Sequence, residues 1–87
     1  MYVIVVYDVN VQRVSKVCQF LRTFLHWVQN SVFEGELTES ELLKVELELK
    51  KIIDEDEDSV AIYILPSDKV IERKFIGVKK SEPTYLI

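Results

Sequence analysis

The chain has 87 residues, 48% of them apolar, so it forms one domain at most. A chain of this length buries only about 60 to 65% of its unfolded surface, and this apolar fraction therefore predicts an apolar surface that a second copy covers. The single cysteine, Cys18, excludes an internal disulfide, and since we find neither an apolar run of about 18 residues nor a signal segment, we expect a cytoplasmic protein without membrane association.

The net charge of −4 is unevenly distributed along the chain. Residues 9–33 carry three basic side chains and no acidic one, whereas residues 34–58 carry eleven acidic and three basic side chains. Because the local field decides whether a polyanion binds, a basic face beside an acidic helix keeps nucleic acid open as a ligand.

The first half of the chain predicts a strand, a helix and an extended region. Residues 2–7 form an unbroken β-branched and aromatic run, typical of a central strand covered on both faces, and Asp8 ends it. Asn10 is a plausible N-cap of a helix that runs to about Leu25, because apolar residues then follow at helical spacing. Residues 27–37 indicate either one bent strand or a tight hairpin, in which Gly35 marks a bulge or a close backbone approach.

The second half begins with the clearest local signal, a capping box in which Thr38 and Glu41 start a second helix. Residues 54–58 then form a charged, solvated loop, and the alternative is that they form a binding site for a cation or for a basic partner. Residues 60–65 predict a second buried central strand, residues 70–78 a more polar edge strand, and residues 84–87 an apolar end that pairs with a second subunit. The order predicts one α+β domain over residues 1–87, a ferredoxin-like sandwich with both helices on one face of the sheet and a C-terminal extension over about 79–87.

Asp8 is the first candidate for chemistry, because ligand sites often gather at the carboxyl ends of strands and a carboxylate is a hard oxygen donor suited to Mg²⁺. The alternative is a turn residue or a helix cap. One carboxylate is a poor metal site, so the magnesium hypothesis requires a twofold axis that brings two copies of Asp8 together.

Basic residues supply the candidate phosphate contacts, and the alternative for all of them is a solvated polar face. They lie on or near the first helix and toward the end of the chain: Arg13, Lys16, Arg22, Arg73, Lys74, Lys79 and Lys80. Cys18 is expected to be a buried, inert thiol, and His26 either a general base or a helix-end residue that interacts with the dipole. Aromatic residues such as Trp27 are expected in the core rather than as base-stacking platforms.

Two stretches closely resemble a known family. Tyr7-Asp8-Val9 follows an apolar first strand and precedes Arg13 and Lys16, and residues 29–38 read Gln-Asn-Ser-Val-Phe-Glu-Gly-Glu-Leu-Thr. Over residues 2 to about 65 the chain resembles the small CRISPR-associated adaptation protein, the second of the two near-universal CRISPR proteins and the partner of the integrase. It departs from the family at residues 24–27, Phe-Leu-His-Trp, where members often have a glycine and a basic residue. The departure implies a bulkier helix end and one fewer phosphate contact.

This resemblance implies a homodimer that binds Mg²⁺ between paired Asp8 side chains and acts as an endoribonuclease or DNase. It also implies that the dimer bridges the CRISPR integrase and holds DNA destined for insertion as a new spacer. Arg13 and Lys16 match the family in kind and would contact nucleic acid, and Arg22 is a further candidate because it lies near the same helix. The C-terminal strand would pack on the partner subunit, with an interface formed by Tyr7, Tyr85, Leu86 and Ile87.

Two rival hypotheses remain open beside a metal-dependent phosphodiesterase. One is a non-catalytic scaffold of the integrase complex, in which Asp8 only caps a turn or stabilises the dimer. The other is a regulatory ferredoxin-like module that binds a small molecule between subunits, or a related toxin-type ribonuclease. Only analogy of fold supports the regulatory version.

Overall fold

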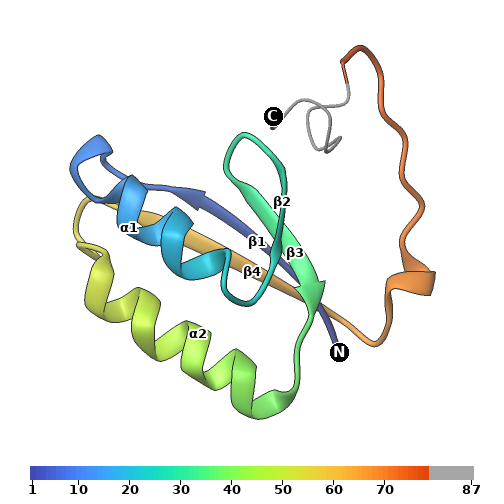
Figure 1. Ribbon diagram of the computed structural model, residues 1–87, viewed down its shortest axis with the longest axis horizontal. Helices are drawn as coiled ribbons and strands as arrows, with labels where there is room; N and C mark the ends of the chain where they lie inside the picture. Colours follow the sequence, from blue (N-terminus) through green and yellow to red (C-terminus); the bar gives the residue numbers. More distant parts are fainter. Residues whose placement is uncertain (79–87) are drawn as a thin grey trace.

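A computed structural model describes residues 1–78 of the chain (Figure 1). Four antiparallel strands form one sheet in the order β2-β3-β1-β4, with one helix after β1 and one after β3. This arrangement confirms the predicted α+β fold. The elements are β1 (Tyr2–Asp8), α1 (Val11–Leu21), β2 (His26–Gln29), β3 (Val32–Glu36), α2 (Glu39–Ile52), β4 (Ser59–Leu65) and a 3₁₀ turn (Asp68–Val70).

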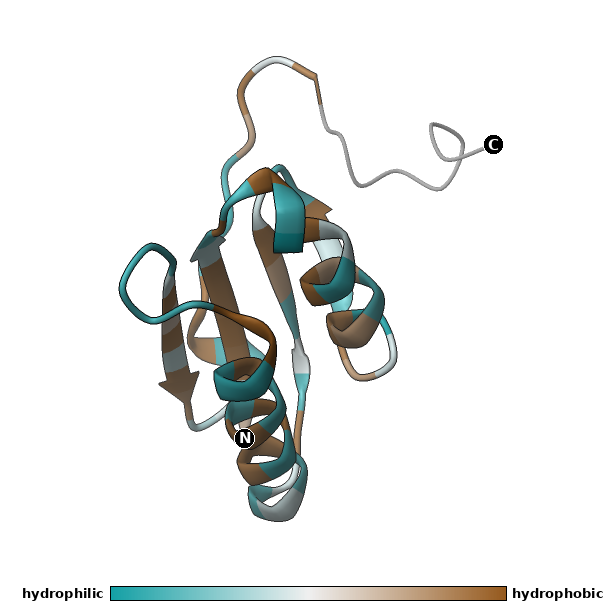
Figure 2. Cartoon of the chain, turned by 90° about the vertical axis from the view of Figure 1, so that its left-hand side faces the viewer, coloured by the Kyte–Doolittle hydropathy of each residue, from teal (hydrophilic) through white to brown (hydrophobic). Residues whose placement is uncertain are grey.

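Both helices cover the same face of the sheet. Successive side chains of a strand point to opposite faces, and Val3, Val5 and Tyr7 of β1 are the buried set. They join buried residues of both helices in one core cluster, completed by Val17, Leu21, Leu25, Phe33, Leu37, Val45 and Leu49. Figure 2 shows the apolar residues concentrated along the strands, with hydrophilic residues distributed over the helices. The predicted two-layer arrangement, with both helices on one face, is therefore confirmed.

Neither helix covers the opposite face of the sheet, which we call the open face, and Arg73 from the segment after β4 contacts it at Tyr2 and Glu34. Val6 of β1 is 36% exposed, so the expectation that this strand is covered on both faces was wrong for a single chain. The expectation that residues 60–65 form a central strand was also wrong, because β4 lies at the sheet edge and Tyr63 is 57% exposed. Unbroken apolar runs predict strands covered on both faces, but one layer of helices can cover only one face of the sheet.

Helix α1 begins where the sequence predicted and ends one turn earlier. The side chain of Asn10 accepts a hydrogen bond from the backbone N–H of Gln12 at 2.9 Å, which confirms the N-cap. The helix ends at Leu21, and the hydroxyl of Thr23 donates to the carbonyl oxygen of Phe20 at 2.7 Å. Leu25 is nevertheless buried in the core cluster, and its backbone N–H bonds to the carbonyl oxygen of Leu21 at 2.8 Å.

Residues 27–37 form a hairpin rather than one bent strand. The turn is at Asn30, whose φ of 43° lies in the left-handed region that asparagine tolerates better than most residues. Trp27 closes the turn, since its indole N–H donates to the carbonyl of Asn30 at 3.0 Å. Gly35 is a site of close approach, because a Cβ there would lie 3.1 Å from Cδ2 of Leu25.

The segment that follows β4 differs from its prediction. Residues 70–78 were expected to form an edge strand, but in the structure Asp68–Val70 is a 3₁₀ turn and residues 71–78 have no regular secondary structure. The hydroxyl of Ser67 caps the turn by accepting from the backbone N–H of Lys69 at 2.9 Å. The apolar end at residues 84–87 and the extension at 79–87 lie outside the described residues.

Candidate functional site

Asp8 is the last residue of β1 and lies on the open face. It occupies the same side of the strand as Val6, and its backbone pairs with Ser59 of β4. Its side chain is exposed, and within residues 1–78 no hydrogen bond or ion pair engages the carboxylate. The carboxylate is therefore not engaged by any of residues 1–78.

A metal ion would need donors beyond those that one copy supplies. Among residues 1–78 no three acidic, histidine or cysteine side chains lie close enough together to hold a metal ion. Mg²⁺ binds through one or two carboxylates and keeps several waters, so an exposed carboxylate on an open face fits an ion shared between two copies. The donor set fits Mg²⁺ in that arrangement and does not fit a complete site within one chain.

Asp58 forms a buried polar cluster next to Asp8 that the sequence did not reveal. Its side chain is 0% exposed. Oδ1 accepts hydrogen bonds from the backbone N–H of Asn10 (2.9 Å) and from Nη2 of Arg13 (3.1 Å). Oδ2 accepts from the backbone N–H of Asp54 (2.8 Å) and from Nε of Arg13 (2.7 Å). We call Asp58 and its donors the Asp58 clasp, to which Glu57 adds an exposed ion pair with Arg13 at 3.0 Å.

The clasp changes the role expected for Arg13. Its hydrogen bonds to Asp58 hold the pKa of that carboxyl well below its usual range and outweigh the opposing effect of burial. The same contact raises the pKa of the Arg13 guanidinium. Arg13, predicted as a phosphate contact, is therefore occupied inside the chain. The expectation that residues 54–58 form a solvated loop was wrong for Asp58, whose side chain is buried. The sequence could not show this, because no local signal distinguishes Asp58 from the acidic residues before it.

The other predicted phosphate contacts lie apart from each other. Lys16 faces a groove between α1 and α2, which it shares with Arg13 and Lys51. Arg22 is exposed at the C-cap of α1, six residues or about 9 Å further along the helix axis. The structure thus does not bring Arg13, Lys16 and Arg22 into one cluster. His26 is exposed at the start of β2, so the helix-end position predicted for it was wrong.

A second buried ion pair fastens the segment after β4 to the sheet. Glu34 of β3 is 6% exposed; it accepts a hydrogen bond from the hydroxyl of Tyr2 at 2.6 Å and pairs with the guanidinium of Arg73. Burial and the neighbouring Glu34 raise the pKa of Tyr2 to about 12. Burial opposes ionisation of Glu34 itself, but the bonds from Arg73 and Tyr2 prevail and lower its pKa. Arg73 is therefore also engaged internally rather than free for phosphate.

Tyr7, predicted at a subunit interface, lies inside the core. It is 4% exposed, its ring stacks on Phe33 with centroids 6.1 Å apart, and its hydroxyl lies 2.9 Å from Sγ of Cys18. Burial, and then the contact with Cys18, raise the pKa of Tyr7. The thiol of Cys18, expected to be buried, is half-buried and contacts the Tyr7 hydroxyl. Tyr7 has little surface left for a second subunit, and Tyr85, Leu86 and Ile87 lie outside the described residues.

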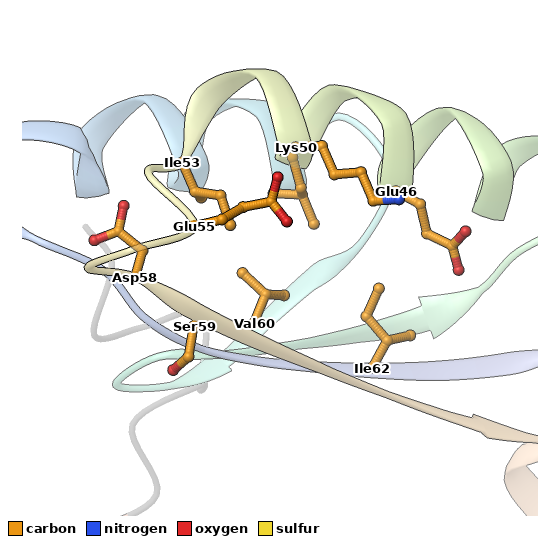
Figure 3. A pocket seen from close by; sticks show the side chains of 9 residues that line it. Glu46, Lys50, Ile53, Glu55, Asp58, Ser59, Val60 and Ile62 are labelled. Carbon is orange, nitrogen blue, oxygen red and sulfur yellow. The ribbon is translucent and has the colours of Figure 1, made fainter.

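An apolar groove runs between α2 and the free edge of β4 (Figure 3). Val60 and Ile62 of β4 point up toward the helix, whereas Ser59 is turned to the other side of the strand. The groove is completed by Leu49 and Ile53, with charged side chains at its rim. Asp58 lies at one end of it, so the groove and the clasp are neighbours.

Within residues 1–78 no helix is both long enough and apolar enough to cross a membrane.

The chain is similar to proteins of one family over nearly its whole length. Residues 1–73 match the model of the family described as CRISPR associated protein Cas2. The CRISPR-associated endoribonuclease Cas2 of Methanothermobacter thermautotrophicus is 52% identical over 80 residues, which are 92% of this chain and 88% of that protein. The protein of the same name from Pyrococcus furiosus is 56% identical over 81 residues, 93% of each chain. A crystal structure of a Cas2 protein matches with a TM-score of 0.87 and 55% identity, and the match covers 94% of this chain and 92% of that one.

Proposed function

The chain belongs to the CRISPR-associated protein Cas2 family, as its sequence resemblance indicated, and from this premise we propose that it is a metal-dependent endonuclease of CRISPR adaptation. Single-stranded RNA is the first substrate to consider, because relatives about half identical to this chain are named endoribonucleases. Double-stranded DNA is the second. We place the protein in the cytoplasm, as a homodimer that also bridges the CRISPR integrase.

The observation that carries the proposal is the exposed Asp8 carboxylate at the end of a central strand. It has no partner in residues 1–78, although other acidic groups of the chain, such as Asp58 and Glu34, are held by buried ion pairs. An acidic side chain at a strand end that serves only as a turn cap would accept a hydrogen bond from nearby backbone. Asp8 accepts none, which favours a role toward a ligand.

In the proposed reaction the Asp8 carboxylates of two copies would be the protein ligands of a Mg²⁺ ion. When bound, the ion supplies charge that polarises a phosphate oxygen or activates a water molecule. Lys16 and Arg22 are the exposed cations of α1, and they attract the phosphate backbone in a manner that weakens as salt concentration rises. Arg13 instead bonds to Asp58 and Glu57 of the α2–β4 loop.

The homodimer is supported by the open face and by the free edge of β4. Val6 and Tyr63 present apolar surface on the open face, and the apolar side chains Ile62 and Ile64 lie on the other side of β4. We propose that two open faces pack together and that the C-terminal segment of each copy, which ends Tyr85-Leu86-Ile87, adds to β4 of the other beside the groove of Figure 3.

The test is cleavage of labelled single-stranded RNA and double-stranded DNA by wild type and Asp8→Asn, each with Mg²⁺ and with a chelator. Asp56→Asn is the matched control, because it removes an exposed acidic group of the α2–β4 loop. We expect metal-dependent cleavage by wild type and Asp56→Asn, and a loss of at least 100-fold in Asp8→Asn, since removing a metal ligand removes the charge that acts on the phosphate. Sedimentation of each variant checks that the dimer persists.

The second candidate is a non-catalytic scaffold, favoured by the finding that residues 1–78 contain no group of three acidic, histidine or cysteine side chains that could hold a metal ion. Equal cleavage by wild type and Asp8→Asn, or none by either, would support it. Spacer acquisition then becomes the assay. If Asp8→Asn protein still binds the integrase and still supports acquisition, the carboxylate has no chemical role and the scaffold is the function.

A further inference from the structure

We propose that Asp58 is a positioning residue for Asp8, and that the Asp58 clasp sets the place and direction of the Asp8 carboxylate for metal binding. The proposal rests on the function proposed above. It concerns a residue that neither holds the metal nor touches the substrate, and it gives the ion pair between Asp58 and Arg13 a role within the chain.

The position of the clasp in the chain is the first argument. Asn10, whose backbone N–H bonds to Asp58, is only two residues after Asp8. Ser59, which pairs with Asp8 across the sheet, is the residue directly after Asp58. Asp8 is therefore fixed on both sides, by the strand ladder through Ser59 and by the clasp through Asn10.

The second argument is that Asp8 forms the last pair of the ladder. The ladder between β1 and β4 runs from the pair of Tyr2 with Leu65 to the pair of Asp8 with Ser59. Terminal pairs of a sheet open most easily, because nothing beyond them restrains the chain. The clasp supplies that restraint, since it joins the loop after β1 to the loop before β4.

The third argument is that only a carboxylate satisfies these four donors. Each oxygen of Asp58 accepts one backbone N–H and one N–H of Arg13. An asparagine would offer one acceptor oxygen and direct its own N–H₂ group at donors, which leaves buried N–H groups unsatisfied. Lysine likewise cannot replace Arg13, because an ammonium group cannot supply two parallel N–H groups to one carboxylate.

The effect on metal binding follows from the geometry that Mg²⁺ demands. The ion accepts little departure from octahedral geometry, so a ligand that moves between several positions binds it more weakly. Loss of residues that orient metal ligands typically lowers metal affinity 10- to 100-fold. We therefore expect Asp58→Asn to weaken metal binding at Asp8 while the fold is kept.

The experiment compares wild type, Asp58→Asn and Glu57→Gln as full-length dimers. Glu57→Gln is the matched control, because it removes only the exposed ion pair to Arg13 and leaves the clasp. Titration with Mn²⁺ alone, followed by paramagnetic broadening of the amide signals of residues 8 and 9, measures metal binding without any cleavage. We expect half-maximal broadening at about tenfold higher Mn²⁺ in Asp58→Asn and no change in Glu57→Gln.

Amide exchange and order parameters at residues 8–10 separate this proposal from the proposed function. If wild type binds no Mn²⁺ at Asp8, the proposed metal site fails, but faster exchange at Asn10 and lower order at Asp8 in Asp58→Asn would still establish positioning. If Asp58→Asn does not fold, Arg13→Lys replaces it, and we expect a smaller increase in the Mn²⁺ concentration at half-maximal broadening. A folded variant with wild-type Mn²⁺ titration and wild-type order at Asp8 overturns the proposal.

Discussion

At the scale of single residues, the tertiary surroundings of an acidic side chain decide whether it is exposed or buried, and its neighbours in sequence do not. Asp8 and Asp58 are both aspartates at an end of a strand region, yet one is exposed and the other has 0% of its side chain exposed. Four hydrogen bonds stabilise the charge of Asp58 in the interior. The contribution of Asp58 to the free energy of unfolding can therefore be tested separately from ligand binding at Asp8.

The depressed pKa of Asp58 predicts acid sensitivity. A carboxyl whose pKa is lower in the folded state than in the unfolded state stabilises the fold above the unfolded value, near pH 4, and loses this contribution as pH falls toward the folded value. We therefore expect the free energy of unfolding of wild type to fall as pH is lowered below about 4, and to fall less steeply in Asp58→Asn. Urea unfolding at pH 2.5 to 7 measures this.

Asp56→Asn is the control for that series, because Asp56 lies in the same loop with an exposed side chain. It should keep the wild-type dependence on pH. An equal slope in wild type and Asp58→Asn would show that the clasp does not couple protonation to folding.

Sequence reasoning at this scale found Asp8 and missed Asp58 and Glu34. Asp8 follows an apolar strand, and that pattern is local. Asp58 depends on Arg13, 45 residues away, and Glu34 depends on Arg73, 39 residues away. Such pairs are set by tertiary structure, so the same arginines were read as exposed cations.

At the scale of elements, the parts that the sequence predicted well are those with local causes. The start of α2 depends on one turn of chain: the hydroxyl of Thr38 accepts from the backbone N–H of Glu41 at 3.2 Å, and the Glu41 carboxylate accepts from the backbone N–H of Thr38 at 2.9 Å. The bond from the backbone N–H of Thr38 to the carboxylate also lowers the pKa of Glu41. By contrast, whether β4 is central or at an edge depends on the order of strands, which no local pattern contains.

The capping box predicts a measurable stability effect. Thr38→Ala removes one acceptor of the first helical turn and should lower the free energy of unfolding by about 1 kcal/mol. For a domain of this size that corresponds to a fall in Tm of about 4–8 °C. Thermal unfolding followed by circular dichroism measures it. Ser40→Ala is the control, since among residues 1–78 its hydroxyl lies 3.4 Å from that of Thr38 but accepts no backbone N–H. A fall equal to that of Thr38→Ala would contradict the capping role.

At the scale of the whole molecule, the open face of the sheet has exposed apolar side chains that neither α1 nor α2 covers. The sequence suggested an apolar excess from composition alone, and the structure places part of it on β1 and β4, where Val6 and Tyr63 are exposed. A single layer of helices leaves this face to water unless another surface covers it. The proposed dimer joins this requirement to the chemistry, because Asp8 lies on the same face.

A charge on the open face should therefore separate the subunits. Tyr63 is 57% exposed in the single chain, so Tyr63→Glu introduces no charge into the core of one subunit but would bury it in a dimer through this face. We expect wild type to sediment as a dimer at micromolar concentration and Tyr63→Glu as a folded monomer that has also lost Mg²⁺-dependent cleavage, since each copy then supplies one carboxylate.

Leu43→Glu is the matched control for this change. Leu43 of α2 is 55% exposed, and α2 packs on the opposite face of the sheet. Its substitution by glutamate should leave both the dimer and cleavage unchanged. If Tyr63→Glu stays dimeric, the open face is not the interface and the two copies of Asp8 have no reason to meet. If it becomes monomeric but cleaves as wild type does, one carboxylate suffices and the shared metal site is excluded.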